Sequence, residues 1–260
     1  MKIRLQTIFL SLIAAFGLSS CFDINQVVNV KKDGSGTIEE TMLVAIPPEL
    51  AALGGDQDPI ADLLKQGKHK ERAKEMGEGV EFVSAEPFAG KEGAKGLKTI
   101  FKFADINKLK LSGDGGMSSL NPDPNAQATK KLDEQLIRFK FDKASTKLTI
   151  MMPPMEGVEG MGDQEIDPAQ FAMASQIMKG MRIRVGVKPE GKITETNATY
   201  SDAESVTLMD LEMKNLVTDL DTFKAFGALS EEKDRSKVAA KLKEFGVKAE
   251  TKEEIEIEFK

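Results

Sequence analysis

The sequence predicts an α+β protein in which a mainly antiparallel sheet of about ten strands packs with four or five helices. Three observations lead to this fold class. Apolar side chains recur at every second position in many short segments, the period of a strand with one buried face. Only a few segments show the 3.6-residue period of a helix. Strands and helices also do not alternate as a parallel βαβ sheet requires, and we find no internal repeat.

The chain after residue 23 begins with a predicted β-hairpin. Inward positions alternate over 24–30 and 38–46, and Asp33-Gly34-Ser35-Gly36 supplies the turn between them. Asp58-Pro59 then predicts the cap and first residue of a helix that reaches about Met76. Two further strands are expected in this half, at 80–85 and 97–103, and residues 111–129 are expected to form an irregular segment.

Two more hairpins are expected in the second half. Alternation over 137–141 is answered over 148–152, and alternation over 183–187 is answered over 192–200 after the turn Pro189-Glu190-Gly191. Single strands are predicted at 205–213 and 254–260.

Three helices are expected among these strands. Asp167-Pro168 opens the first, whose apolar residues fall on one face as far as Met181. The others are predicted over 218–229 and 231–245, with Ser230 as the cap of the last helix and Gly246 at its end.

The first twenty residues have the pattern of an export signal. Lys2 and Arg4 precede an uncharged, mostly apolar stretch that is shorter than the roughly 20 residues of a membrane-spanning helix. Leu18-Ser19-Ser20-Cys21 closes it and resembles the lipobox of bacterial lipoproteins. The resemblance implies cleavage between Ser20 and Cys21, and acylation of Cys21, with palmitate among the acyl chains. The alternative is an ordinary signal peptide followed by an unmodified cysteine.

We therefore expect residues 1–20 to be a cleaved signal peptide and residues 21–260 to be a single exported domain anchored at Cys21. Only Phe22 and Asp23 separate this cysteine from the strand expected at Ile24, so the domain should lie close to the bilayer. Phe22 stands where Asp would signal inner-membrane retention in enteric-type bacteria. By that resemblance, the outer membrane facing the periplasm is favoured if the source has two membranes.

The composition argues against several function classes. One Cys and one His do not suffice for a Cys–His nucleophile or a His-rich metal site, and His69 lies in a highly charged stretch that suggests a solvated helix face. The 36 Lys and Arg against 42 Asp and Glu argue against nucleic acid as a partner. We expect no catalysis, no cofactor and no metal site.

The later strands carry a family resemblance. The hairpin turn after the lipobox, the block Val187-Lys188-Pro189-Glu190-Gly191-Lys192-Ile193, Thr196-Asn197-Ala198 and Ser205-Val206-Thr207-Leu208 resemble the LppM-type domain of bacterial lipoproteins. The resemblance covers nearly all of residues 21–260. It implies a curved antiparallel sheet, membrane tethering, and the lipid or glycolipid binding proposed for some members.

Methionine is concentrated in one segment, since seven of the thirteen lie between residues 151 and 181. They could fill a core, form an adaptable apolar surface, or ligate Cu(I) through their thioethers. The candidate surface for an apolar ligand consists of Met151, Met152, Met155, Phe171, Met178 and Met181.

The function expected from these observations is that of a cell-envelope lipoprotein whose non-catalytic domain binds lipid or another apolar envelope component. Its partners would be the membrane, through the lipid anchor, and a lipid ligand or an envelope protein. Two alternatives remain: a structural or assembly lipoprotein that acts through protein contacts, and a metal-handling lipoprotein.

Overall fold

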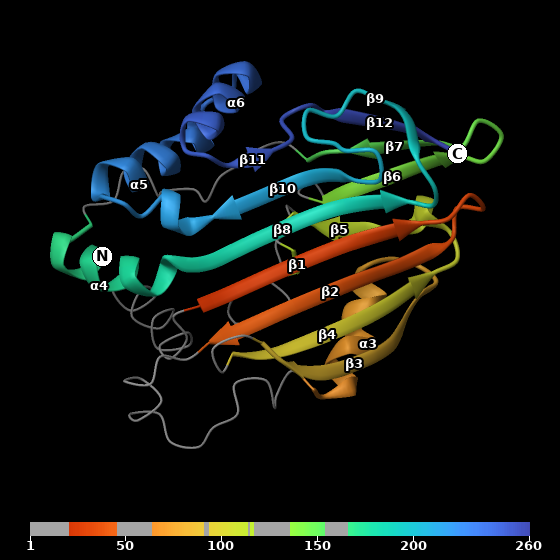
Figure 1. The fold of residues 1–260 in the computed structure, drawn as a ribbon, viewed down its shortest axis with the longest axis horizontal. Coiled ribbons are helices and arrows are strands. Elements are labelled where there is room, and N and C mark those ends of the chain that lie inside the picture. The colour runs from red at the N-terminus through yellow and green to blue at the C-terminus, as the bar shows by residue number, and fades with distance from the viewer. Residues whose placement is uncertain (1–20, 46–63, 91–93, 114, 117–135, 154–165) are drawn as a thin grey trace, which may run out of the picture.

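The computed structural model describes residues 21–45, 64–90, 94–113, 115–116, 136–153 and 166–260, and it confirms the α+β class (Figure 1). The described residues contain twelve strands in two mostly antiparallel open sheets, together with four α-helices. The ten expected strands are all present. The two additional strands are very short, at Lys110–Ser112 and Lys248–Ala249.

The larger sheet has seven strands in the order β11-β10-β8-β1-β2-β4-β3. Their bounds are β1 (Cys21–Val30), β2 (Gly36–Ala45), β3 (Val80–Ala89), β4 (Lys95–Phe103), β8 (Gly180–Pro189), β10 (Val206–Glu212) and β11 (Lys248–Ala249). β1 and β8 are parallel, and the other pairs in this sheet are antiparallel.

The first predicted hairpin is confirmed as β1 and β2. Its turn closes through hydrogen bonds from Lys31 N to Ser35 O (2.8 Å) and from Ser35 N to Asp33 Oδ1 (2.8 Å). Gly34 has a φ of +84°, which a residue without Cβ adopts at little cost. The hairpin therefore follows from local turn chemistry together with alternation in both strands.

The smaller sheet has five strands in the order β5-β6-β7-β12-β9. Their bounds are β5 (Lys110–Ser112), β6 (Leu136–Asp142), β7 (Lys147–Met151), β9 (Ile193–Thr196) and β12 (Glu254–Phe259). β6 and β7 confirm the second predicted hairpin. The irregular segment expected over 111–129 begins within β5, and residues 117–129 lie outside the described residues.

The third predicted hairpin is wrong, although both of its strands exist. β8 pairs with β1 and β10, so both of its edges are occupied, and β9 pairs with β12 in the smaller sheet. The turn leads from one sheet to the other. Gly191 has a φ of +90°, and a Cβ there would lie 2.0 Å from Lys260 O. Lys192 and Lys260 exchange two backbone hydrogen bonds just beyond it.

The main core lies between the two sheets, where inward side chains of both meet. Val28 and Ile38 from the larger sheet share one cluster with Phe139, Ile150 and Ile257 from the smaller sheet, and all five are at most 3% exposed. Ala73 of helix α3 (Gln66–Glu75) and Met76, which follows that helix, belong to the same cluster. Helix α3 and the smaller sheet thus cover one face of the larger sheet.

The α-helices are α3 (Gln66–Glu75), α4 (Pro168–Met178), α5 (Leu220–Gly227) and α6 (Arg235–Glu244). Figure 1 shows α4 and α5 near the end of the sheet where β1 begins, and the smaller sheet toward the end where β1 finishes. Asp167 caps α4 as predicted, accepting from Ala169 N at 2.7 Å. Of the helix expected from Asp58, residues 58–63 lie outside the described residues.

The cap expected at Ser230 is wrong. Residues Ala228–Glu231 form a short 3-10 turn, and Asp234 caps α6 by accepting from Ser236 N at 2.9 Å. The chain is extended at Glu232 and at Asp234, so the α-helix begins only after them. Gly246 follows the helix with a φ of +71°, the left-handed conformation common just after a helix. This agrees with the prediction that the helix ends at Gly246.

Candidate functional site

The lipobox cysteine lies at the first residue of β1. Cys21 is in register with Ala45 on β2 and with Gly180 on β8. The strand thus begins three residues before the predicted start at Ile24, and Phe22 and Asp23 belong to it. Ser20 lies outside the described residues. No residue of spacer separates Cys21 from the sheet.

A polar groove runs along the other face of the larger sheet, which no described element covers and which we call the uncovered face. Successive cross-strand rows on this face are Thr37, Asn29 and Lys188, and then Val27, Gly186 and Thr207. Gly186 adds no side chain to the second row, so the surface is hollowed there over about 620 Å³. A second hollow of about 470 Å³ adjoins it beside Lys188 and Glu204.

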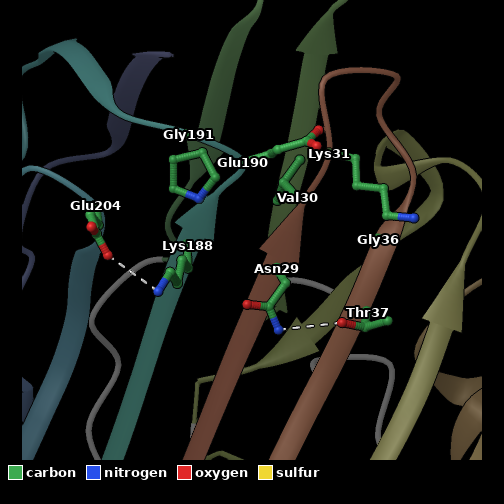
Figure 2. Close-up of a pocket in the computed structure, with 10 residues that line it drawn as sticks. Asn29, Val30, Lys31, Gly36, Thr37, Lys188, Glu190, Gly191 and Glu204 are labelled. Atoms are coloured by element: carbon green, nitrogen blue, oxygen red, sulfur yellow. Dashed lines mark hydrogen bonds and ion pairs between the residues drawn. The ribbon is translucent and has the colours of Figure 1, made fainter. Parts of the chain in front are cut away.

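Ion pairs and hydrogen bonds line this groove, and Figure 2 shows those of the smaller hollow. Lys188 Nζ lies 3.4 Å from Glu204 Oε2, and Asn29 Nδ2 donates to Thr37 Oγ1 at 3.3 Å. Arg184 Nη2 donates to both carboxylate oxygens of Asp23, at 3.0 and 3.2 Å. The charges on the lining are nearly balanced and both donors and acceptors are present, so the groove suits a polar ligand of low net charge.

Arg182 forms ion pairs with two carboxylates on the same face, near the end of the sheet where β1 begins. Its Nε and Nη2 donate to the two oxygens of Asp210, each at 2.8 Å, and its Nη1 lies 3.2 Å from Glu212 Oε1. The hydrogen bond from Arg182 lowers the pKa of Asp210 below its usual range. The same pair raises the pKa of Arg182.

This pair predicts a loss of stability in acid. A depressed pKa in the folded state means that the contribution of Asp210 is complete above its unfolded pKa of about 3.9 and is lost as pH falls through the folded value. Because the Arg182 side chain is 35% exposed, we expect the pair to contribute about 1 kcal/mol to the free energy of unfolding. The gap in unfolding free energy between wild type and Asp210→Asn should therefore close below about pH 4.

Chemical denaturation at several pH values measures this gap. Glu204→Gln, which removes an exposed carboxylate from the same face, is the control and should show a much smaller gap. A gap for Asp210→Asn that stays constant down to pH 3 would contradict the assignment.

A buried polar cluster lies on the opposite, covered face of the sheet. Arg72 Nη2 donates to Glu40 Oε1 at 2.9 Å and forms an ion pair with Glu40 Oε2 at 2.8 Å, and Gln26 Nε2 donates to Glu40 Oε1 at 2.8 Å. All three residues are at most 7% exposed. The Arg72 guanidinium also lies 5.5 Å from the centre of the Phe101 ring, within the range of a cation–π contact.

The solvated position expected for His69 is wrong. Its side chain is 2% exposed and stacks on Phe82, with ring centres 5.1 Å apart and planes 10° apart. Sequence reasoning missed this because many lysines surround the histidine. His69 lies three, four and seven residues before Arg72, Ala73 and Met76, which places all four on one helical face. This spacing could have predicted that the histidine is buried.

The predicted methionine surface is divided by the structure. Phe171 is buried in a cluster with Val217 and Phe223, and Met178 packs against that cluster. Met152 packs instead against the main core between the sheets. Met151 and Met181 are half-buried, on β7 and at the start of β8, and Met155 lies outside the described residues. The structure therefore brings together only Phe171 and Met178.

The described residues contain no group of three or more His, Cys, Asp or Glu that could hold a metal ion. Within the same residues, no helix is long and apolar enough to cross a membrane.

Comparison with known proteins gives similarity to solved structures alone. No family model and no curated protein matches the chain. Among solved structures, the chain is similar to the folded domain of Mycobacterium tuberculosis LppM, determined by NMR. The two are 10% identical with a TM-score of 0.31, and the similarity covers 76% of this chain and 85% of that chain. What this chain does must follow from its own residues.

Proposed function

We propose that this chain is a lipoprotein of the bacterial cell envelope whose non-catalytic domain works at the membrane surface. One observation carries the proposal: β1 begins at Cys21, the residue that completes the lipobox Leu18-Ser19-Ser20-Cys21. Two or three acyl chains on Cys21 would give stable anchoring, since each buried CH₂ contributes about 0.8 kcal/mol. The destination we propose for a source with two membranes is the outer membrane, on its periplasmic side.

The ligand we propose is a lipid or another apolar envelope component. Phe22 and Met181 support this proposal, because both are half-buried apolar residues. They are in register on neighbouring strands, in the row next to the one that contains Cys21. The polar groove around Gly186 lies on the other face of the same strands, so the sheet separates it from this apolar contact. The proposed lipid contact is therefore at Phe22 and Met181, beside the strand end that carries the anchor.

The anchor is tested by replacing its acceptor. In Cys21→Ala we expect complete loss of labelling by an alkyne fatty acid and accumulation of the uncleaved precursor, because the only thiol has been removed. Ser20→Ala keeps a small residue before the cysteine and should be labelled normally. Normal labelling of Cys21→Ala would reject the proposal.

A further inference from the structure

Five of the seven strands of the larger sheet end together near the level of Cys21. Phe22 is in register with Val44 and with Met181, Val44 with Lys95, and Lys95 with Ala89. This row of residues crosses five strands and lies one residue from Cys21. The row defines one end of the sheet, which we call the anchor end. The opposite end carries the turn 31–35 and Glu190, whose backbone N donates to Val30 O at 2.7 Å.

The two ends of the sheet lie at very different distances from Cys21. At about 3.3 Å per residue, the row through Phe22 lies about 3 Å from the level of Cys21, whereas Val30 lies about 30 Å from it. The polar layer on each side of a bilayer is roughly 5 to 7 Å thick. If Cys21 is acylated as proposed, the anchor end therefore lies at the depth of the head groups.

The side chains at this end suit a bilayer surface. Phe88 is 37% exposed and lies on the edge strand β3, next to Ala89 and three strand spacings, or about 14 Å, from β1. Its ring packs over Gly96, where a Cβ would lie 2.3 Å from it. Lys95 and Lys179 are exposed at the same end. Aromatic rings and lysines with apolar stems are the residues that occupy the interface between lipid and water.

We infer that the anchor end of the larger sheet faces the bilayer and that Phe88 enters its interface. This inference rests on the proposed acylation of Cys21 and adds the orientation of the domain to it. The polar groove, on the face of the sheet and not at its end, then stays open to the aqueous side.

Two labelled variants test the orientation. Cys21 is the only Cys, so once it is acylated a cysteine introduced at Ala89 or at Glu190 is the single free thiol. Each mature lipidated protein is labelled with an environment-sensitive fluorophore and reconstituted into phosphatidylcholine vesicles containing phosphatidylglycerol. Brominated lipids should quench the label at position 89 at least roughly twofold more than the label at position 190.

Two substitutions test the role of Phe88 in the Ala89→Cys protein. Phe88→Ser should reduce the quenching, whereas Val83→Ser, the other exposed large apolar residue described on β3, should leave it unchanged. Equal quenching at positions 89 and 190 overturns the orientation even if both proteins float with the vesicles. Proteins that do not float at all overturn the anchor and the orientation together, and flotation separates that outcome from the first.

Discussion

Deletion of residues 254–260 is expected to abolish cooperative unfolding. β12 lies between β7 and β9 in the smaller sheet, so its loss removes pairing on both sides. Ile255, Ile257 and Phe259 are completely buried in the main core. Burial of such side chains contributes about 1.5 to 3 kcal/mol each, and a typical domain has only about 5 to 15 kcal/mol of net stability.

Thermal unfolding followed by circular dichroism measures this effect. A triple substitution of Glu254, Glu256 and Glu258 by Gln keeps the buried face and should retain a cooperative transition. Ile257→Ala alone should cost about 2 to 4 kcal/mol, because it leaves a cavity in a packed core. A truncated protein with the melting curve of the wild type would show that the C-terminal strand is peripheral.

The sequence was sufficient to predict the strands because alternation is a local property. Most of the predicted strands, β1, β6 and β12 among them, alternate between buried residues and more exposed ones, and that period survives whichever strand becomes the neighbour. Pairing is not local. The turn at Pro189 to Gly191 has the composition of a hairpin turn, yet it connects two sheets because β1 and β10 already occupy both edges of β8.

The candidate sites were harder to predict for the same reason. Cys21 was identified because the lipobox is contiguous in sequence. The groove depends on Gly186 lying between Val27 and Thr207, two residues that only the strand order brings beside it. The methionine segment showed the reverse error, since residues close in sequence were divided between two cores.

The buried cluster beneath α3 provides the second large effect. Glu40 follows the alternation of Ile38 and Met42, so the strand period turns its carboxylate toward the core. Arg72 of α3 is the cation that compensates it. Removal of one charge from a buried pair leaves the other uncompensated, which costs about 3 to 5 kcal/mol. We therefore expect Arg72→Met and Glu40→Leu each to lower the free energy of unfolding by that amount.

The double variant Glu40→Leu/Arg72→Met distinguishes a cost of unpaired charge from a cost of lost packing. Replacing both partners by apolar residues leaves no buried charge, so most of the loss should be recovered. A residual cost of about 1 to 3 kcal/mol is expected because Gln26 loses its acceptor. Denaturant unfolding of the single and double variants gives the coupling energy.

The neighbouring pair Glu39 and Lys98 is a matched control. It joins β2 to β4 on the uncovered face of the same sheet with the same separation of 2.8 Å, but both side chains are more than 40% exposed. Breaking it should cost only about 0 to 1 kcal/mol, because water already solvates both charges. If Arg72→Met cost no more than Lys98→Met, burial would not be what makes the Glu40 pair important, and α3 would be held by its apolar contacts alone.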